Sequence, residues 1–133
     1  MLDQLSVKNF VVVEDLNIEF LHGMTVVTGE TGAGKSIIVQ ALNLAIGGRS
    51  DAALVRNGKS KAEIIATFSF DGNQSIQSVL EGLDLEDGNE CILRRVIGSD
   101  GKSRSYVNGS NVTLSTLRDV GSHLIDMHGQ NEH

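Results

Sequence analysis

A glycine-rich octapeptide lies between two apolar segments that repeat with different periods. Residues 29–36 read Gly-Glu-Thr-Gly-Ala-Gly-Lys-Ser. The segment before it, Met24–Thr28, is short and mostly apolar with two valines, which is typical of a strand buried on both faces. From Lys35 to Ile46, apolar residues recur at three- and four-residue spacing, which predicts a largely buried helix. This order of elements predicts an α/β fold with the strand at its centre.

The octapeptide fits the phosphate-binding loop (P-loop) pattern: a glycine, four residues, then Gly-Lys-Ser. Glycines at 29, 32 and 34 allow backbone N–H groups to point inward and phosphates to approach without meeting a Cβ. We expect Lys35 to reach the β- and γ-phosphates of ATP and to serve catalysis, and Ser36 to ligate Mg²⁺. The full set of predicted nucleotide contacts is Gly29, Glu30, Thr31, Gly32, Ala33, Gly34, Lys35, Ser36 and Ile37. A ligand-free glycine turn is the disfavoured alternative.

The rest of the chain reads mainly as antiparallel strands. Period-two alternation predicts two strands in the first twenty residues and one over 62–70, with further strands over 90–97 and 102–107. The dipeptide Asn108-Gly109 favours a hairpin turn, and Gly47-Gly48 a left-handed end to the preceding helix. A short helix capped by Thr113 or Ser115 should follow, and then a final strand over Leu124–Met127.

Composition bounds the class of protein. With 133 residues and 40% hydrophobic residues, one domain is expected. A single cysteine, no export leader and no apolar run long enough to span a membrane predict a cytoplasmic protein. The net charge of -6 and pI near 5.1 argue against a broad surface for a polyanion. Six basic residues fall mid-chain, where a solvated strand face is favoured over a binding patch: Lys59, Lys61, Arg94, Arg95, Lys102 and Arg104.

Four segments in order resemble the N-terminal part of the RecN family of bacterial DNA-repair proteins, in the SMC-like branch of the ABC-type ATPases. They are Leu2–Phe10, Gly23–Ser36, Gly47–Arg49 and Leu124–Gln130. The resemblance implies a P-loop NTPase half-head with a mixed sheet, in which residues 1–133 form one incomplete domain. A coiled coil and a C-terminal half with the signature motif and Walker B carboxylates would follow. The resemblance also implies that Gln130 contacts Mg²⁺ and the attacking water, as a catalytic and metal-binding residue.

The chain itself contains neither a convincing Walker B strand nor a Leu-Ser-Gly-Gly signature. We therefore expect it to bind ATP weakly and to hydrolyse little alone. The resemblance implies that the complete protein pairs two heads around two ATP molecules, and that it holds DNA during double-strand-break repair and recombination. Its expected partners are the C-terminal half of its own head, a second head and DNA, with no membrane, at the nucleoid.

Two alternatives remain open. One is a non-catalytic module whose association is controlled by nucleotide, and the other is a GTPase or kinase, disfavoured by the lack of Asn-Lys-x-Asp. Asn9 to Val12 is a candidate region for contact with the base. A metal site at His123, His128, Glu132 and His133 fits no ordinary zinc spacing, so loop and strand-end roles are favoured there.

Overall fold

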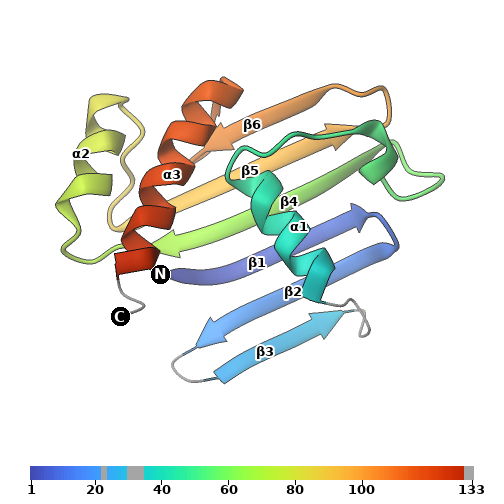
Figure 1. Cartoon of the computed structure of the whole chain (residues 1–133), viewed down its shortest axis with the longest axis horizontal. Coiled ribbons are helices and arrows are strands. Elements are labelled where there is room, and N and C mark those ends of the chain that lie inside the picture. Colours follow the sequence, from blue (N-terminus) through green and yellow to red (C-terminus); the bar gives the residue numbers. More distant parts are fainter. Residues whose placement is uncertain (22–23, 30–34, 131–133) are drawn as a thin grey trace.

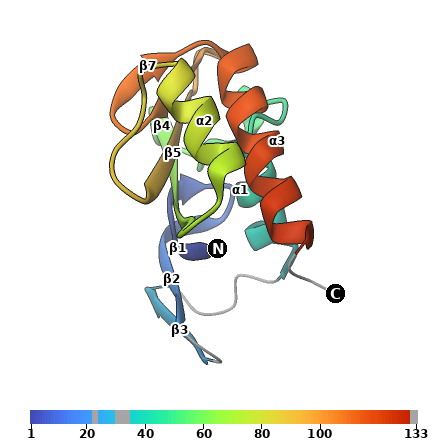
Figure 2. The same cartoon turned by 90° about the vertical axis from the view of Figure 1, so that its left-hand side faces the viewer.

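The computed structural model describes residues 1–21, 24–29 and 35–130, and it shows one sheet with helices on one face (Figures 1 and 2). The sheet has seven strands in the order β3-β2-β1-β4-β5-β6-β7, and every neighbouring pair is antiparallel. The strands are β1 (Leu2–Phe10), β2 (Val13–Leu21), β3 (Met24–Gly29), β4 (Lys61–Ser69), β5 (Glu90–Gly98), β6 (Ser103–Val107) and β7 (Ser110–Val112). The helices are α1 (Lys35–Ala45), a 3-10 turn η1 (Ala52–Leu54), α2 (Gln74–Gly82) and α3 (Leu114–Gln130).

The core lies between the sheet and the helices α1 and α3. Strands β4 and β5 bury alternate residues on this face, as the period-two pattern predicted. Helix α1 adds Ala41, Leu44 and Ala45, while Leu117, Val120 and Leu124 of α3 are also buried. The α/β class is therefore confirmed, with α2 packed beside α3. Among the described residues, no helix is long and apolar enough to cross a membrane.

Three predicted turns and caps are present. Asn108 and Gly109 have φ values of 49° and 86°, as a two-residue type I′ hairpin between β6 and β7 requires. Gly47 ends α1 with φ 108°. The hydroxyl of Thr113 accepts a hydrogen bond from the Thr116 amide at 3.1 Å and so caps α3.

Strand β3 is not the central, buried strand that its sequence predicted. Among the described residues it pairs with β2 alone and lies at the edge of the sheet, and residues 25–29 are exposed. Val27 is 47% exposed although it points to the face that carries the helices. An apolar strand of this kind is usually covered by other elements on both of its faces. Within the described part of the chain, β3 has one neighbouring strand and its residues 25–29 remain exposed.

Two helical segments also differ from expectation. The predicted final strand over Leu124–Met127 is wrong, since α3 continues through these residues with Leu124 and Met127 buried. Helix α2 was not predicted, although its start carries a clear signal. The Asn73 carboxamide oxygen accepts hydrogen bonds from the Ser75 and Ile76 amides at 3.1 and 3.3 Å.

Candidate phosphate-binding site

The chain leaves the sheet at Gly29, the last residue of β3. Gly29 pairs with Leu16 of β2 and has φ 97°. A Cβ at this position would lie 2.4 Å from the backbone oxygen of Asp15. The left-handed conformation and the close approach both require glycine, so the first glycine of the motif has a structural reason that the pattern alone did not give.

Helix α1 begins at the other end of the motif. Lys35 and Ser36 are its first two residues, and both are exposed. The first turn contains no acidic residue. The first N–H groups of a helix have no partner within the helix and lie at the positive end of its dipole, an arrangement that suits an anion. Ile37, the last predicted contact, is half-buried against the core.

Five predicted contacts fall outside the described residues: Glu30, Thr31, Gly32, Ala33 and Gly34. Their roles stay predictions. The structure describes the elements on either side of them. Strand β3 ends at the constrained Gly29, and α1 starts with exposed Lys35 and Ser36.

The turn between β1 and β2 lies at the end of the hairpin towards which β3 leads (Figure 1). Val11 donates its amide to Leu54 O at 2.7 Å, and Arg56 donates to Asn9 O at 2.8 Å. These bonds join the turn to the segment after η1. A shallow groove of about 440 Å³ lies between them and is lined by Val11, Val12, Arg56 and Lys59, among others. The candidate base-contact region, Asn9 to Val12, stays a prediction.

Gln130 is the last residue of α3, not a residue that follows a strand. The end of α3 lies by the start of β1, since Met127 and Met1 line the same groove of about 840 Å³. In Figure 1, α1 begins towards the opposite end of β1. The structure does not bring Gln130 beside Lys35 and Ser36, and its catalytic role stays a prediction.

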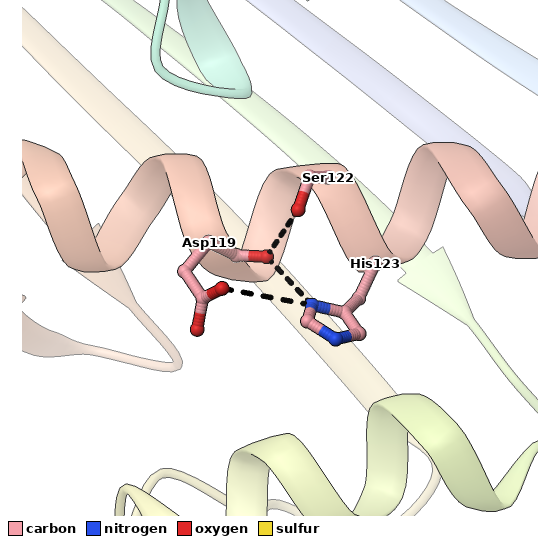
Figure 3. A network of polar contacts seen from close by, with 3 residues as sticks. All are labelled: Asp119, Ser122 and His123. Carbon is pink, nitrogen blue, oxygen red and sulfur yellow. Dashed lines mark hydrogen bonds and ion pairs between the residues drawn. The ribbon is translucent and has the colours of Figure 1, made fainter.

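The terminal histidines show no sign of a metal site in the part that is described. His123 contacts its own helix, with Nδ1 2.8 Å from Asp119 O and 3.9 Å from Asp119 Oδ1 (Figure 3). Ser122 donates to the same backbone oxygen at 2.9 Å. Across the described ranges, no three His, Cys, Asp or Glu side chains are placed to hold a metal ion. The side chain of His128, and residues Glu132 and His133, lie outside the description.

Basic residues are spaced unevenly along the strands. Between Lys61 and Arg94 the chain carries acidic residues but no lysine or arginine. Lys61, at the start of β4, is in register with Gly98 at the end of β5. Lys102 lies in the turn that follows, and its carbonyl oxygen accepts a hydrogen bond from the Gly98 amide at 2.7 Å. Lys8 and Arg104 lie in one row across the sheet, in register with Glu63 and Val96. Five exposed basic residues lie towards the β5–β6 end, which we call the basic end: Lys8, Lys59, Lys61, Lys102 and Arg104. Three acidic residues lie among them, since Asp15 and Glu63 are in register with Lys8 and Asp100 accepts a hydrogen bond from the Lys102 amide.

The two adjacent arginines of β5 behave differently from the solvated strand face that was expected. Arg94 is half-exposed, forms an ion pair with Glu63 at 2.7 Å and lies 4.7 Å from the centre of the Tyr106 ring. Arg95 is completely buried on the other face, so the prediction is wrong for this residue.

Comparison with known proteins settles the family. The family described as "AAA domain" matches residues 4–132. The chain belongs to this AAA domain family. It is also 50% identical, over its whole length, to the DNA repair protein RecN of Vibrio cholerae serotype O1 and 44% identical, over 99% of its length, to RecN of Bacillus subtilis strain 168. It spans 24% and 23% of those proteins, about a quarter of their length. The resemblance to the RecN family is confirmed.

Solved structures with the same fold are ATPase heads. The fold matches a chain from work on ATP-driven dimerization and DNA-stimulated activation of SMC ATPases, with a TM-score of 0.69 and 24% identity over 93% of this chain and 79% of that one. It also matches the recombination mediator protein RecF, solved as RecF-ATPrS, with a TM-score of 0.60 and 18% identity over 88% of this chain and 29% of RecF. At these identities the likeness shows the fold alone, which the chain shares with SMC ATPases and RecF.

Proposed function

We propose that this AAA-domain chain is the ATP-binding N-terminal half of the head of a RecN-like ATPase that acts in DNA double-strand-break repair and recombination. The observation that carries the proposal is the junction of β3 and α1. A strand ends at a glycine that tolerates no side chain, and the next described element opens with exposed Lys35 and Ser36. Residues 1–133 would form one incomplete domain.

Mg-ATP fits the groups that border this loop. The helix start offers free N–H groups and no acidic side chain that would repel a phosphate. Hydrogen bonds to the anion, at about 1.5–3 kcal/mol each, outweigh a dipole contribution of about 0.3–1 kcal/mol. Lys35 would bind the β- and γ-phosphates, and the hydroxyl of Ser36 would hold Mg²⁺. The metal would neutralise charge on the phosphate oxygens.

Hydrolysis would require the remainder of the protein. Both faces of β3 carry an exposed valine, Val26 at 36% and Val27 at 47%, and we expect the C-terminal half of the head to cover this strand and its edge. That half would also supply the carboxylates that this chain lacks. An SMC ATPase of the same fold is described as dimerizing with ATP, which supports a second head as partner. In such a pair, Gln130 would contact Mg²⁺ and the attacking water.

DNA would be the macromolecular partner of the complete protein, in the cytoplasm at the nucleoid. The relatives that match the whole chain are named DNA repair proteins. The basic end offers the positive charge that a phosphate backbone attracts, although the chain as a whole is acidic. Contact by this end would be sequence-independent, because phosphate contacts carry no base information.

The direct test is ATP titration of the full-length protein with and without Mg²⁺. The wild type is compared with Lys35→Ala and with Lys61→Ala, a control that removes an equally exposed lysine from β4. We expect Lys35→Ala to weaken binding by about tenfold or more, as loss of a charge-assisted contact of roughly 1.5–3 kcal/mol implies. Equal affinity in all three proteins would remove the phosphate loop from the proposal. Tight binding without turnover would favour a nucleotide-controlled interaction module instead.

A further inference from the structure

Arg95 is the one charged residue that is fully buried within the described ranges. Its Nη1 donates to Leu44 O and to Gly48 O, each at 2.8 Å, and Nη2 donates to Ser103 Oγ at 3.3 Å. Leu44 lies in the last turn of α1, and Gly48 lies just after the helix. Burial, and secondarily the neighbouring Arg118, lower the pKa of the Arg95 guanidinium. The negative end of the helix dipole offsets part of this cost.

A second arginine reaches the same helix end from α3. Nε of Arg118 donates to Gly47 O at 2.8 Å. Carbonyl groups at a helix C-terminus have no partner within the helix. Here, Leu44 O in the last turn of α1 and the carbonyl groups of Gly47 and Gly48 after it accept hydrogen bonds from two guanidinium groups that belong to β5 and α3. The helix that carries Lys35 and Ser36 is thus fixed at its far end by two separate elements.

The contact between α1 and α3 leaves no room for intervening side chains. A Cβ on Gly47 would lie 2.4 Å from Arg118 Cγ, and a Cβ on Gly121 would lie 2.6 Å from Ile46 O. Each glycine therefore allows the other helix to approach. We call Ile46, Gly47, Arg118 and Gly121 the α1–α3 junction. Away from it, α3 packs mainly on α2 and β6.

Each helix connects the junction to a proposed ligand contact. These contacts are Lys35 and Ser36 at the start of α1 and Gln130 at the end of α3. Helix α1 has 11 residues, so its start lies about 16 Å from the junction. Helix α3 continues from Gly121 to Gln130 over about 13 Å. A helix of this length is stiff, so a small displacement at its start is transmitted along its axis against the hydrogen bonds that Arg95 and Arg118 make at its far end. Backbone contact there passes the displacement on, because packed interfaces do not deform freely.

We propose that Arg118 is a positioning residue that couples occupancy of the phosphate loop, through α1, to the C-terminal part of α3. This inference rests on the proposed function. Phosphate binding at Lys35 and Ser36 shifts the start of α1, which is already helical, and the Arg118–Gly47 bond passes the shift to α3. The place of Gln130 and of the chain beyond it is thereby set by nucleotide.

The test uses the full-length protein and two readouts, ATP turnover and amide hydrogen exchange over residues 122–130 with and without ATP. Arg118→Ala removes the bond to Gly47. Ser122→Ala is the matched control on the same helix, since its hydroxyl bonds only to Asp119 O within α3 (Figure 3). Arg118→Lys keeps one donor for the same carbonyl.

In the wild type and in Ser122→Ala, ATP should slow exchange over residues 122–130. In Arg118→Ala this protection should disappear and kcat should fall by about tenfold or more, while ATP affinity stays within roughly threefold, because positions far from the chemistry act on geometry. Arg118→Lys should recover part of both. Gly121→Ala, which forces Ile46 and α3 apart and leaves Arg118 intact, should reproduce the loss.

Unchanged kcat and protection in Arg118→Ala would overturn the coupling. A parallel fall of ATP affinity and kcat in Arg118→Ala would also overturn it, because the junction would then stabilise the fold without coupling the two helices. A wild type that binds no ATP would refute the proposed function itself, whereas ATP binding without any change of exchange in α3 would refute only the coupling.

Discussion

The backbone oxygen of Asp15 stands 2.4 Å from the place where a side chain on Gly29 would begin. Gly29→Ala should therefore destabilise the fold by more than the roughly 1–3 kcal/mol that a left-handed alanine costs, because β2 and β3 must also separate. Urea unfolding measures the change. Gly58→Ala is the control, since Gly58 has φ 85° but open space around its Cβ position. Equal losses of stability in the two variants would mean that the backbone at Asp15 moves away from the new side chain at no energetic cost.

Removal of the Arg95 side chain should be among the most damaging substitutions in the chain. Arg95→Ala leaves Gly48 O without the Arg95 donor, removes one of the two donors to Leu44 O and creates a cavity, so we expect a loss of about 3–5 kcal/mol. Arg95→Met fills the cavity but supplies no donor, and should lose less. Denaturant midpoints rank the variants, and a loss below about 1 kcal/mol for Arg95→Ala would contradict the role given to the guanidinium.

The buried thiol of Cys91 should make stability fall at high pH. Burial raises the pKa of Cys91 to about 12 from a usual value of 9.0. Above pH 9 the unfolded chain loses this proton while the folded chain keeps it, so stability falls by at most about 1.4 kcal/mol per pH unit until pH 12. Below pH 9 the contribution is fully present. Comparison with Cys91→Ala isolates the slope, and an identical pH profile in both proteins would count against the burial effect.

The ion pair between Arg94 and Glu63 should contribute little. Its side chains are 37% and 23% exposed, so solvent and salt screen the attraction. A double-mutant cycle with Arg94→Met and Glu63→Gln should give a coupling of about 0.2–1 kcal/mol that shrinks in salt. A coupling that salt does not change would contradict this account.

Charge at the basic end should govern the salt dependence of DNA binding by the full-length protein. Lys102→Gln with Arg104→Gln should weaken binding to duplexes of unrelated sequence equally, and lower the salt slope by about 0.9 for each phosphate that is no longer neutralised. Gln74→Glu with Ser78→Glu gives the same change in net charge on exposed positions of α2. A similar effect of both double variants would assign the weaker binding to net charge and not to this surface.

Local patterns in the sequence predicted local structure well. Period-two alternation placed β4 and β5, and Asn108-Gly109 placed the last hairpin, because each depends on neighbouring residues. The same alternation could have found buried Arg95, which has the parity of Cys91, Leu93 and Ile97. Its acceptors on α1 could not be read, because they depend on packing between distant segments.

The errors have one physical cause. An apolar segment indicates that its side chains are buried, but not which other element buries them. Met24–Thr28 therefore looked central although β3 is an edge strand, and Leu124–Met127 looked like a strand although its burial continues that of α3. At the site, the motif placed Lys35 and Ser36 correctly at the start of a helix. Whether Gln130 contacts Lys35 and Ser36 in the complete protein depends on parts of the protein outside the described residues.

The open edge of β3 has a consequence for how such a protein is made. The relatives are about four times as long as this chain, so the rest of such a protein takes on the order of tens of seconds to synthesise. During that interval β3 offers unpaired backbone groups and exposed valines to any extended segment nearby. Nascent copies on one polysome would be the nearest source of such segments, so premature pairing between sister chains is the hazard that this architecture must avoid.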